Sequence, residues 1–441
     1  MMPSDIRLYT WVDVEEVFLW KQQQGEWPGW LVWVRAYWDE VTMGIRPGTQ
    51  EAALKWLAEV YDDRFKVDSE QEEMTGLIIL EAVEVNQQTL PVRFEETDEP
   101  VYTPRPTSTL SRPTVLWPPR QYIELPEVLP PDCPPVVAFH SFKGGVGKTT
   151  HALALAQAYA ADFSSKKKPR VLLVDGDLEA PGISWLFEQR FPLPPVSFAD
   201  LIALAHGDFS PEAESAIQLV ADRMANSRID GVYVLPSFRS SGGVTSKAGF
   251  SLLAIKPEHL IQGSKDAFVL TNILSVLGKA LDVDVVLIDL RAGLSELASG
   301  LILDPRVYRI FVTTLSAQSI SGTMKLLELI SERSLYKLVG KEEPLPALIF
   351  AQVPADEQHK DLVMSREHQL LEAAQGFLGA DREILRITTP FAESLQVLPS
   401  SWEDVIMRLQ GAGIVDAMGP VMEWLPSWRV EKDRENKLLR V

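Results

Sequence analysis

The chain has 441 residues, 46% hydrophobic and 23% charged, a globular composition with enough length for two domains. Its 42 basic and 61 acidic residues give a formal net charge of −19, which argues against a protein that coats nucleic acid by neutralising phosphates. The single cysteine, Cys133, excludes an internal disulfide and a cysteine-based zinc site. No secretory signal or membrane-length apolar stretch is visible, so we expect a cytoplasmic protein without a membrane partner.

The first hundred residues are acidic and rich in tryptophan. Residues 1–130 carry 11 Lys/Arg against 23 Asp/Glu, and eight of the twelve tryptophans precede residue 118. Aromatic and β-branched residues predict strands over 29–38 and 76–85, and apolar spacing predicts a helix over 50–61. We therefore expect a small α+β domain over residues 1–98, and we find no catalytic motif in it.

The tryptophans of this domain suggest either a core or a binding surface. Aromatic side chains at strand and helix spacing commonly form a core, yet they are also enriched at the energetic centres of protein interfaces. We hypothesise that some of them bind an unidentified partner protein. The hypothesis fails if Trp27, Trp30 and Trp38 are all buried within the domain.

A proline-rich linker and a second domain follow. Eleven prolines lie between Pro100 and Pro135, and such a segment can continue neither a helix nor a central strand, which predicts a linker over 99–134. From residue 136, short and continuously apolar runs alternate with helical patterns. These runs, typical of buried parallel strands, are 136–140, 171–175, 283–289, 308–314 and 347–351. The sequence predicts a doubly wound, mostly parallel α/β domain over 135–441.

The first of these strands runs into a glycine-rich loop and a helix predicted over 149–160. The loop reads Lys143-Gly-Gly-Val-Gly-Lys-Thr-Thr150, and its backbone N–H groups at a helix N-terminus can surround phosphate oxygens. Lys148 would reach the β- and γ-phosphates, and the Thr149 hydroxyl would ligate Mg²⁺. The expected nucleotide-binding residues of the loop are Gly144, Gly145, Val146, Gly147, Lys148, Thr149 and Thr150.

The sequence of this loop resembles that of the deviant Walker A ATPases, the group that includes MinD, ParA, nitrogenase iron protein and the arsenite-pump ATPases. Phe142 stands where the ordinary pattern begins with glycine, and the additional Lys143 precedes the paired glycines. The resemblance covers roughly residues 135–410. It implies a slow ATPase that acts as a switch, with ATP and Mg²⁺ as ligands and an ATP-dependent homodimer in which Lys143 reaches the partner's nucleotide.

Aspartates at two strand ends can support Mg²⁺, which prefers hard oxygen ligands. One strand ends at Asp175, with Asp177 two residues further on, and another ends at Asp289, four residues before Gly293. By the resemblance, Asp175 and Asp289 support the magnesium shell, largely through water, and Asp177 orients the attacking water. The resemblance also implies that the Gly293 N–H senses the γ-phosphate.

Two positions depart from the pattern of the group. Arg291 stands where MinD- and ParA-type chains commonly have proline, and we hypothesise that it contacts phosphate or the partner subunit. Gln352 follows a predicted strand where relatives often place an asparagine that binds adenine, so preference for ATP rests on the resemblance. The motifs look most like a bacterial subgroup of ParA-like proteins with extra domains, often associated with multi-gene defence or conflict systems.

Four other functions compete with this interpretation. Bacterial tyrosine kinases share the loop but carry a C-terminal tyrosine cluster, whereas no tyrosine follows Tyr336. ParA-like DNA partitioning or cargo positioning needs a basic surface, for which the run 166–170 is the densest candidate. Membrane docking through the tail is disfavoured because residues 431–441 have no apolar face. A scaffold that binds without hydrolysis is disfavoured because the lysine and all three aspartates are present.

Overall fold

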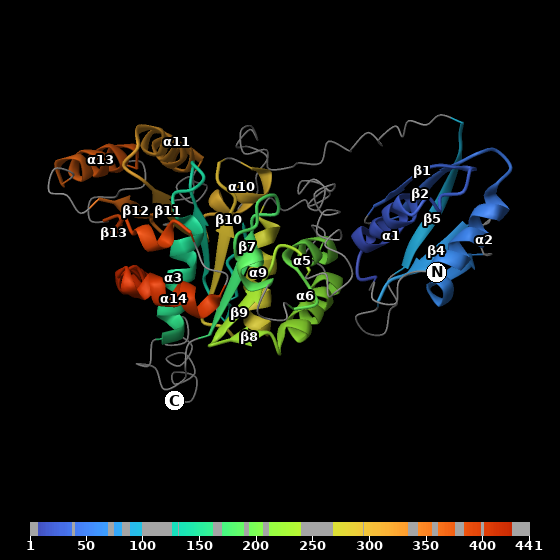
Figure 1. The fold of residues 1–441 in the computed structure, drawn as a ribbon, viewed down its shortest axis with the longest axis horizontal. Coiled ribbons are helices and arrows are strands. Elements are labelled where there is room, and N and C mark those ends of the chain that lie inside the picture. The colour runs from blue at the N-terminus through green and yellow to red at the C-terminus, as the bar shows by residue number, and fades with distance from the viewer. Residues whose placement is uncertain are drawn as a thin grey trace. The chain divides into compact units, whose positions relative to one another are not determined.

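The computed structural model describes fifteen segments of the chain, with elements labelled as in Figure 1. These segments are 8–37, 40–68, 75–81, 89–98, 126–130, 132–161, 170–188, 194–205, 211–239, 268–293, 295–333, 343–354, 360–374, 383–397 and 401–425. The chain divides into two compact units, each with its own sheet, and the described stretches 200–205 and 211–219 group with the first unit. The predicted linker lies mostly outside the described residues, so the domain boundaries at 98 and 135 stay predictions.

The first unit contains a five-stranded sheet in the order β1-β2-β5-β4-β3. β2 and β5 are parallel and the other neighbours are antiparallel. Helix α1 packs on β1, and α2 packs on β3 and β4. The elements are α1 (Trp11–Gln23), β1 (Leu31–Ala36), β2 (Val41–Ile45), α2 (Gln50–Tyr61), η1 (Asp62–Arg64), β3 (Phe65–Asp68), β4 (Thr75–Ile79) and β5 (Thr89–Glu96). The predicted small α+β domain is confirmed, with α2 at its expected bounds.

The tryptophans of this unit are divided between core and surface. Trp11 and Trp33 are buried, whereas Trp27 and Trp30 are half-buried. The Trp30 ring meets the ring of Trp56 edge-on, with centroids 5.9 Å apart. Trp38 lies outside the described residues, and the partner-binding hypothesis stays a prediction.

The second unit contains an eight-stranded sheet in the order β13-β12-β11-β6-β10-β7-β9-β8. All neighbours are parallel except β8 and β9. The strands are β6 (Val136–His140), β7 (Val171–Gly176), β8 (Arg228–Ile229), β9 (Val232–Leu235), β10 (Val285–Leu290), β11 (Tyr308–Thr313), β12 (Ala347–Val353) and β13 (Arg386–Pro390). The predicted doubly wound, mostly parallel sheet is confirmed. The strand predicted from residue 283 begins two residues later.

Helices flank this sheet on both sides (Figure 1). The helices that follow residue 140 in the chain are α3 (Lys148–Ala161), α4 (Ile183–Glu188), α5 (Phe198–Ala205), α6 (Pro211–Met224), α9 (Val269–Ala280), α10 (Glu296–Ile302), α11 (Ala317–Arg333), α13 (Lys360–Ala373), η6 (Glu393–Leu395), α14 (Trp402–Gly411), η7 (Asp416–Met418) and α15 (Gly419–Trp424), of which α5 and α6 belong largely to the first unit. Within the described residues, no helix is both long and apolar enough to cross a bilayer.

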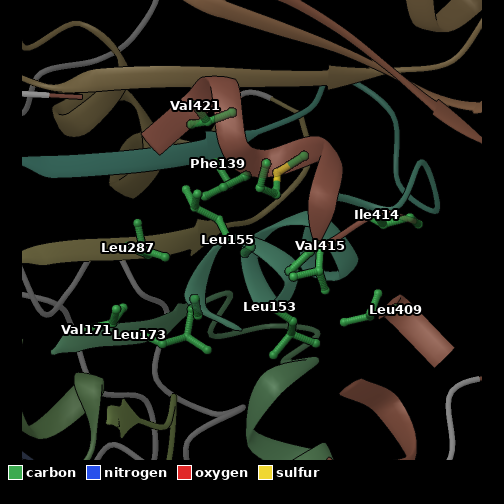
Figure 2. Packing of buried hydrophobic residues seen from close by; sticks show 14 of the residues in the cluster. Phe139, Leu153, Leu155, Val171, Leu173, Leu287, Leu409, Ile414, Val415 and Val421 are labelled. Atoms are coloured by element: carbon green, nitrogen blue, oxygen red, sulfur yellow. The ribbon is translucent and has the colours of Figure 1, made fainter. Parts of the chain in front are cut away.

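Helix α3 is enclosed by the sheet and the C-terminal helices. It packs on β6, β7 and β10, and α14, η7 and α15 cover it from outside. Figure 2 shows Leu153 and Leu155 of α3 among strand residues, including Leu287, and C-terminal residues, including Val415. A helix with apolar residues around its circumference is stable only when buried in this way. The burial fixes the helix N-terminus at the end of β6.

The alternation of side chains along β10 determines which polar residue faces α3. Val285 and Leu287 belong to the core around α3. Val286 points to the opposite face, where a Cβ on Gly278 of α9 would lie 2.6 Å from its Cγ2. Because successive strand residues point to opposite faces, Asp289 shares the face of Leu287 and lies toward α3.

Candidate functional site

The loop between β6 and α3 has the backbone shape of a phosphate-binding loop. Gly145 and Gly147 have φ of +74° and +92°, in the left-handed region that favours glycine. Gly144 and Gly145 are exposed, and Lys143 is exposed beside them. Val146 is buried in the hydrophobic core and holds the loop against it. Left-handed residues in such a turn direct successive N–H groups to one side, which forms a concave anion site at the helix N-terminus.

Lys148 and Thr149 at the start of α3 both contact Asp289 at the end of β10. The Lys148 ammonium donates to Asp289 Oδ1 at 2.5 Å, and the Thr149 hydroxyl donates to Oδ2 at 2.5 Å. The side chains of Lys148 and Asp289 are 9% and 1% exposed. A buried carboxylate needs such partners to remain charged. The structure therefore brings together three residues that the sequence predicted to act at one site.

Asp175 lies beside Asp289, since β7 and β10 pair these two residues in register. Its Oδ2 accepts hydrogen bonds from the Ser184 N–H at 2.7 Å and the Ser184 hydroxyl at 2.8 Å. The Ser237 hydroxyl donates to the Asp175 carbonyl at 2.8 Å. Burial raises the pKa of the Asp175 carboxyl to about 7, and the charge of Asp289 adds to the rise. Sequence reasoning missed both serines because they lie in segments without a motif.

The loop after β7 lies against the phosphate loop. Asp177 lines the cleft described below, and its Oδ1 accepts from the N–H of Ala180 at 2.9 Å. A Cβ on Gly182, at the end of this loop, would lie 3.3 Å from Thr149 Cγ2. Arg291, after β10, forms an ion pair with Glu179. This pair connects the loops that follow β7 and β10, and both side chains are well exposed.

Gly293, four residues beyond Asp289, is held by the end of β6. Its N–H donates to the Ser141 carbonyl at 2.9 Å, and its own carbonyl lies 2.7 Å from His140 Nε2. The φ of Gly293 is +82°, which explains the glycine. Burial lowers the pKa of His140 to about 4, and the charge of Lys148 adds to this effect, so the imidazole is neutral near pH 7.

His151 makes a similar contact with the phosphate loop. Its Nδ1 lies 2.7 Å from the Gly147 carbonyl, and its Nε2 lies 2.9 Å from the Thr389 hydroxyl. Burial lowers the pKa of this imidazole to about 4 as well. Neither histidine was predicted from the sequence, because a single histidine in an apolar segment is usually a core residue. Their partners lie at distant chain positions or on the loop backbone.

A cleft of about 820 Å³ opens above the loop. Residues from 389–397, at the end of β13 and beyond it, form another wall, which exposes the apolar side chains of Phe391 and Val397. The predicted residues that line it are Gly144, Gly145, Gly147, Lys148, Thr149, Thr150, Asp177 and Gln352. Lys143, Arg291 and Gly293 are not among its lining residues, and Val146, Asp175 and Asp289 are buried.

Gln352 lies within β12 rather than after the strand. The pairing of β12 with β13 shifts register between Phe350 and Val353, and Gln352 has a φ of +57°. Such an irregularity redirects one side chain out of the strand pattern. The Gln352 amide donates to the Gly145 carbonyl at 3.1 Å. The residue predicted to contact the base therefore contacts the phosphate loop in this structure.

The fold and the arrangement of the site residues together define a class of protein. A glycine-rich loop follows the first strand of a parallel sheet, and the strand-end Asp289 lies beside its lysine and threonine. These features define a P-loop nucleotide-binding domain. Residues 137–334 match the family model of the CobQ/CobB/MinD/ParA nucleotide-binding domain. No curated protein sequence matches the chain significantly.

Several solved structures are similar to the chain at low identity. A ParA family ATPase from Chlorobium tepidum TLS has 18% identity and a TM-score of 0.39, covering 65% of this chain and 99% of its own. The septum site-determining protein MinD from Pyrococcus horikoshii OT3, complexed with Mg-ADP, has 21% identity and a TM-score of 0.39, covering 64% and 94%. Because these TM-scores lie below 0.5 and the identities below 25%, the likeness carries no functional conclusion.

Proposed function

We propose that this chain is a slow, Mg²⁺-dependent ATPase that acts as a molecular switch. The observation that carries the proposal is the buried cluster of Lys148, Thr149 and Asp289 beneath a loop with two left-handed glycines. A buried cation and a hydroxyl donor, placed at a helix N-terminus, favour an anionic ligand with several oxygens. The cleft that continues to residues 389–397 is large enough for the rest of a nucleotide.

The proposed roles divide among the residues already described. Lys148 binds the β- and γ-phosphates, and the backbone from Gly144 to Thr150 surrounds their oxygens. The Lys148 and Thr149 groups contact Asp289 in this structure, so ligand binding exchanges these contacts for contacts with phosphate. Asp177, on the wall of the cleft, is the group that orients a water for attack. Hydrolysis then depends on positioning and electrostatics.

The donor set also fits Mg²⁺. Mg²⁺ keeps several waters and is usually held by one or two carboxylates together with substrate phosphates, so a dedicated protein cage is not needed. Thr149 and Asp289 would hold the ion, with Asp175 in the surrounding water shell. When bound, the ion would neutralise charge on the transferring phosphoryl group. The described residues contain no cluster of three or more His, Cys, Asp or Glu that could act as such a cage.

The proposal extends to assembly and regulation. Exposed Lys143 would reach the nucleotide of a second copy in an ATP-dependent homodimer, and Arg291 would contact phosphate or that copy. The N-terminal unit would transmit the nucleotide state to a partner protein, in a bacterial multi-gene defence or conflict system. The half-buried Trp27 and Trp30 supply aromatic surface for such a partner.

Binding and size measurements test the switch directly. We would measure the affinity of purified protein for ADP and a slowly hydrolysed ATP analogue with and without Mg²⁺, then its mass with each ligand. We expect Mg²⁺-dependent binding and a dimer with the ATP analogue only. Lys143→Ala should bind nucleotide but remain monomeric. Lys325→Ala, which changes an exposed lysine on α11, should dimerise as the wild type does. Absence of affinity for any purine triphosphate would overturn the proposal.

A further inference from the structure

Two consecutive residues at the end of β6 hold both backbone polar groups of Gly293. Ser141 accepts the Gly293 N–H through its carbonyl, and His140 lies 2.7 Å from the Gly293 carbonyl through Nε2. A carbonyl only accepts hydrogen bonds, so His140 Nε2 carries the proton and donates. Both residues are about 1% exposed, so these contacts form in a buried, low-dielectric environment.

Ser141 connects this contact to the exposed lysine of the loop. While its carbonyl accepts from Gly293, its hydroxyl donates to the Lys143 carbonyl at 2.9 Å. The segment 140–143 therefore joins the loop after β10 to the rim of the phosphate loop. A movement of Gly293 away from Ser141 would be transmitted to the residue that carries the Lys143 side chain.

The Gly293 N–H cannot serve two acceptors at full strength. It is directed at Ser141 in this structure, and a hydrogen bond weakens steeply when its angle departs from linearity. Gly293 does not line the cleft in this structure, although its neighbour Ala292 does, so the Gly293 N–H would donate to a terminal phosphate there only after leaving the Ser141 carbonyl. A nucleoside diphosphate has no terminal phosphate at that place and leaves the contact intact.

We propose that His140 is a positioning residue that holds Gly293 in its diphosphate arrangement, so that the terminal phosphate competes with the His140–Ser141 latch. The latch is defined as two hydrogen bonds, one from the Gly293 N–H to the Ser141 carbonyl and one from His140 Nε2 to the Gly293 carbonyl. This inference rests on the proposed function, because it assumes a nucleotide in the cleft. The latch sets how strongly the chain distinguishes a nucleoside triphosphate from a diphosphate, which gives His140 a regulatory role.

His151 provides a matched control within the same site. It is also buried and also contacts the carbonyl of a left-handed glycine, but this glycine is Gly147 of the phosphate loop. The phosphate loop surrounds the phosphates of both nucleotides. Removing the His151 contact should therefore weaken diphosphate and triphosphate binding together. Removing the His140 contact should instead change the ratio of the two dissociation constants.

The experiment measures the dissociation constants of Mg-ADP and of a slowly hydrolysed ATP analogue for full-length variants. Loss of one hydrogen bond in His140→Leu should increase the preference for the analogue on the order of two- to tenfold. His140→Gln places an amide N–H at similar reach and should restore the wild-type ratio. His151→Leu should weaken both ligands with little change in the ratio. Thermal melting verifies that each variant is folded.

The outcomes separate this inference from the proposed function. An unchanged ratio in His140→Leu, or an equal weakening of both ligands, overturns the latch and leaves the proposed function standing. A wild-type protein that binds neither ligand overturns both. If His140→Leu does not fold, His140→Asn replaces it, because its shorter amide does not reach Gly293. The Asn variant should then show the increased preference and the Gln variant should not.

Discussion

β4 and β5 of the first sheet differ from β6, β7 and β10 of the second in how they are buried, and this difference determines how much function the sequence reveals. β4 and β5 of the first unit alternate between covered and more exposed positions. β6, β7 and β10 of the second unit are buried at every position. In a strand buried on both faces, a polar residue requires a partner or a ligand. Asp175 and Asp289 are conspicuous for this reason, whereas polar residues on a half-exposed strand carry no such signal.

A buried lysine in each unit allows the sharpest test of this comparison. Lys148→Ala should reduce nucleotide affinity on the order of a hundredfold, because a charge-assisted contact with phosphate is lost. It should also destabilise the second unit by about 3 kcal/mol, since Asp289 is left buried without its cation. Calorimetric titration with a slowly hydrolysed ATP analogue and chemical denaturation measure the two effects.

Lys21→Ala is the counterpart in the first unit. Lys21 is buried and donates to Glu26 at 2.5 Å, so its loss should destabilise the first unit. The change should leave nucleotide affinity within about twofold of the wild type, because sites with no shared partners behave independently. A comparable loss of affinity in both variants would show that the two units do not divide the functions as proposed.

The sequence predicted five of the eight strands of the second sheet because these are short and continuously apolar, and it did not predict β8 or β9. It also placed α2 at its observed bounds, since Leu54, Leu57 and Tyr61 repeat at helical spacing. β13 was missed: Arg386–Pro390 alternates exposed and buried residues over five positions and contains two threonines and a proline. A pattern that short does not distinguish a strand from a loop.

The candidate site was predictable where its residues form a local motif. Lys148 and Thr149 belong to one loop, and Asp289 ends a recognisable strand. The wall of the cleft that residues from 389–397 form has no motif, and it reaches the site only through the pairing of β12 with β13. The contact of His140 with Gly293 joins positions 153 residues apart, which no local pattern reveals.

The pH dependence of stability should have opposite signs at two buried groups. Burial raises the pKa of Glu15 in the first unit to about 7, so its stabilising contribution is present below pH 4.5 and is lost as pH rises through 7. Burial lowers the pKa of His151 to about 4, so its contribution is present above pH 6.5 and is lost as pH falls through 4. Each shift corresponds to at most about 3 kcal/mol.

Denaturation of Glu15→Gln and His151→Gln from pH 4.5 to 7 measures these contributions. Relative to the wild type, Glu15→Gln should gain stability as pH rises, and His151→Gln should lose less stability as pH falls. Tryptophan fluorescence reports mainly on the first unit, because seven of the twelve tryptophans lie within residues 1–110. Parallel pH profiles for both variants and the wild type would contradict the assigned burial of these groups.

A close contact in the second unit joins Phe142, at the start of the phosphate loop, to Gly322 of α11. A Cβ on Gly322 of α11 would overlap the Phe142 ring. Gly322→Ala should therefore displace the start of the phosphate loop, destabilise the protein by about 1–3 kcal/mol and weaken nucleotide binding. Adding Phe142→Ala should restore part of both losses because the clash is removed. Additive effects in this double-mutant cycle would show that the ring does not rest on Gly322.

The smallest expected effect on stability concerns the ion pair of Arg291 with Glu179. Both side chains are about 40% exposed, and exposed pairs contribute about 0–1 kcal/mol. Arg291→Ala and Glu179→Ala should therefore melt close to the wild type. If Arg291 contacts phosphate or a second copy as proposed, only Arg291→Ala should lower ATP turnover or ATP-dependent dimerisation. Glu179→Ala frees Arg291 for that role and should not lower either. Equal turnover and dimerisation in Arg291→Ala and wild-type protein would reduce this pair to a surface contact between two loops.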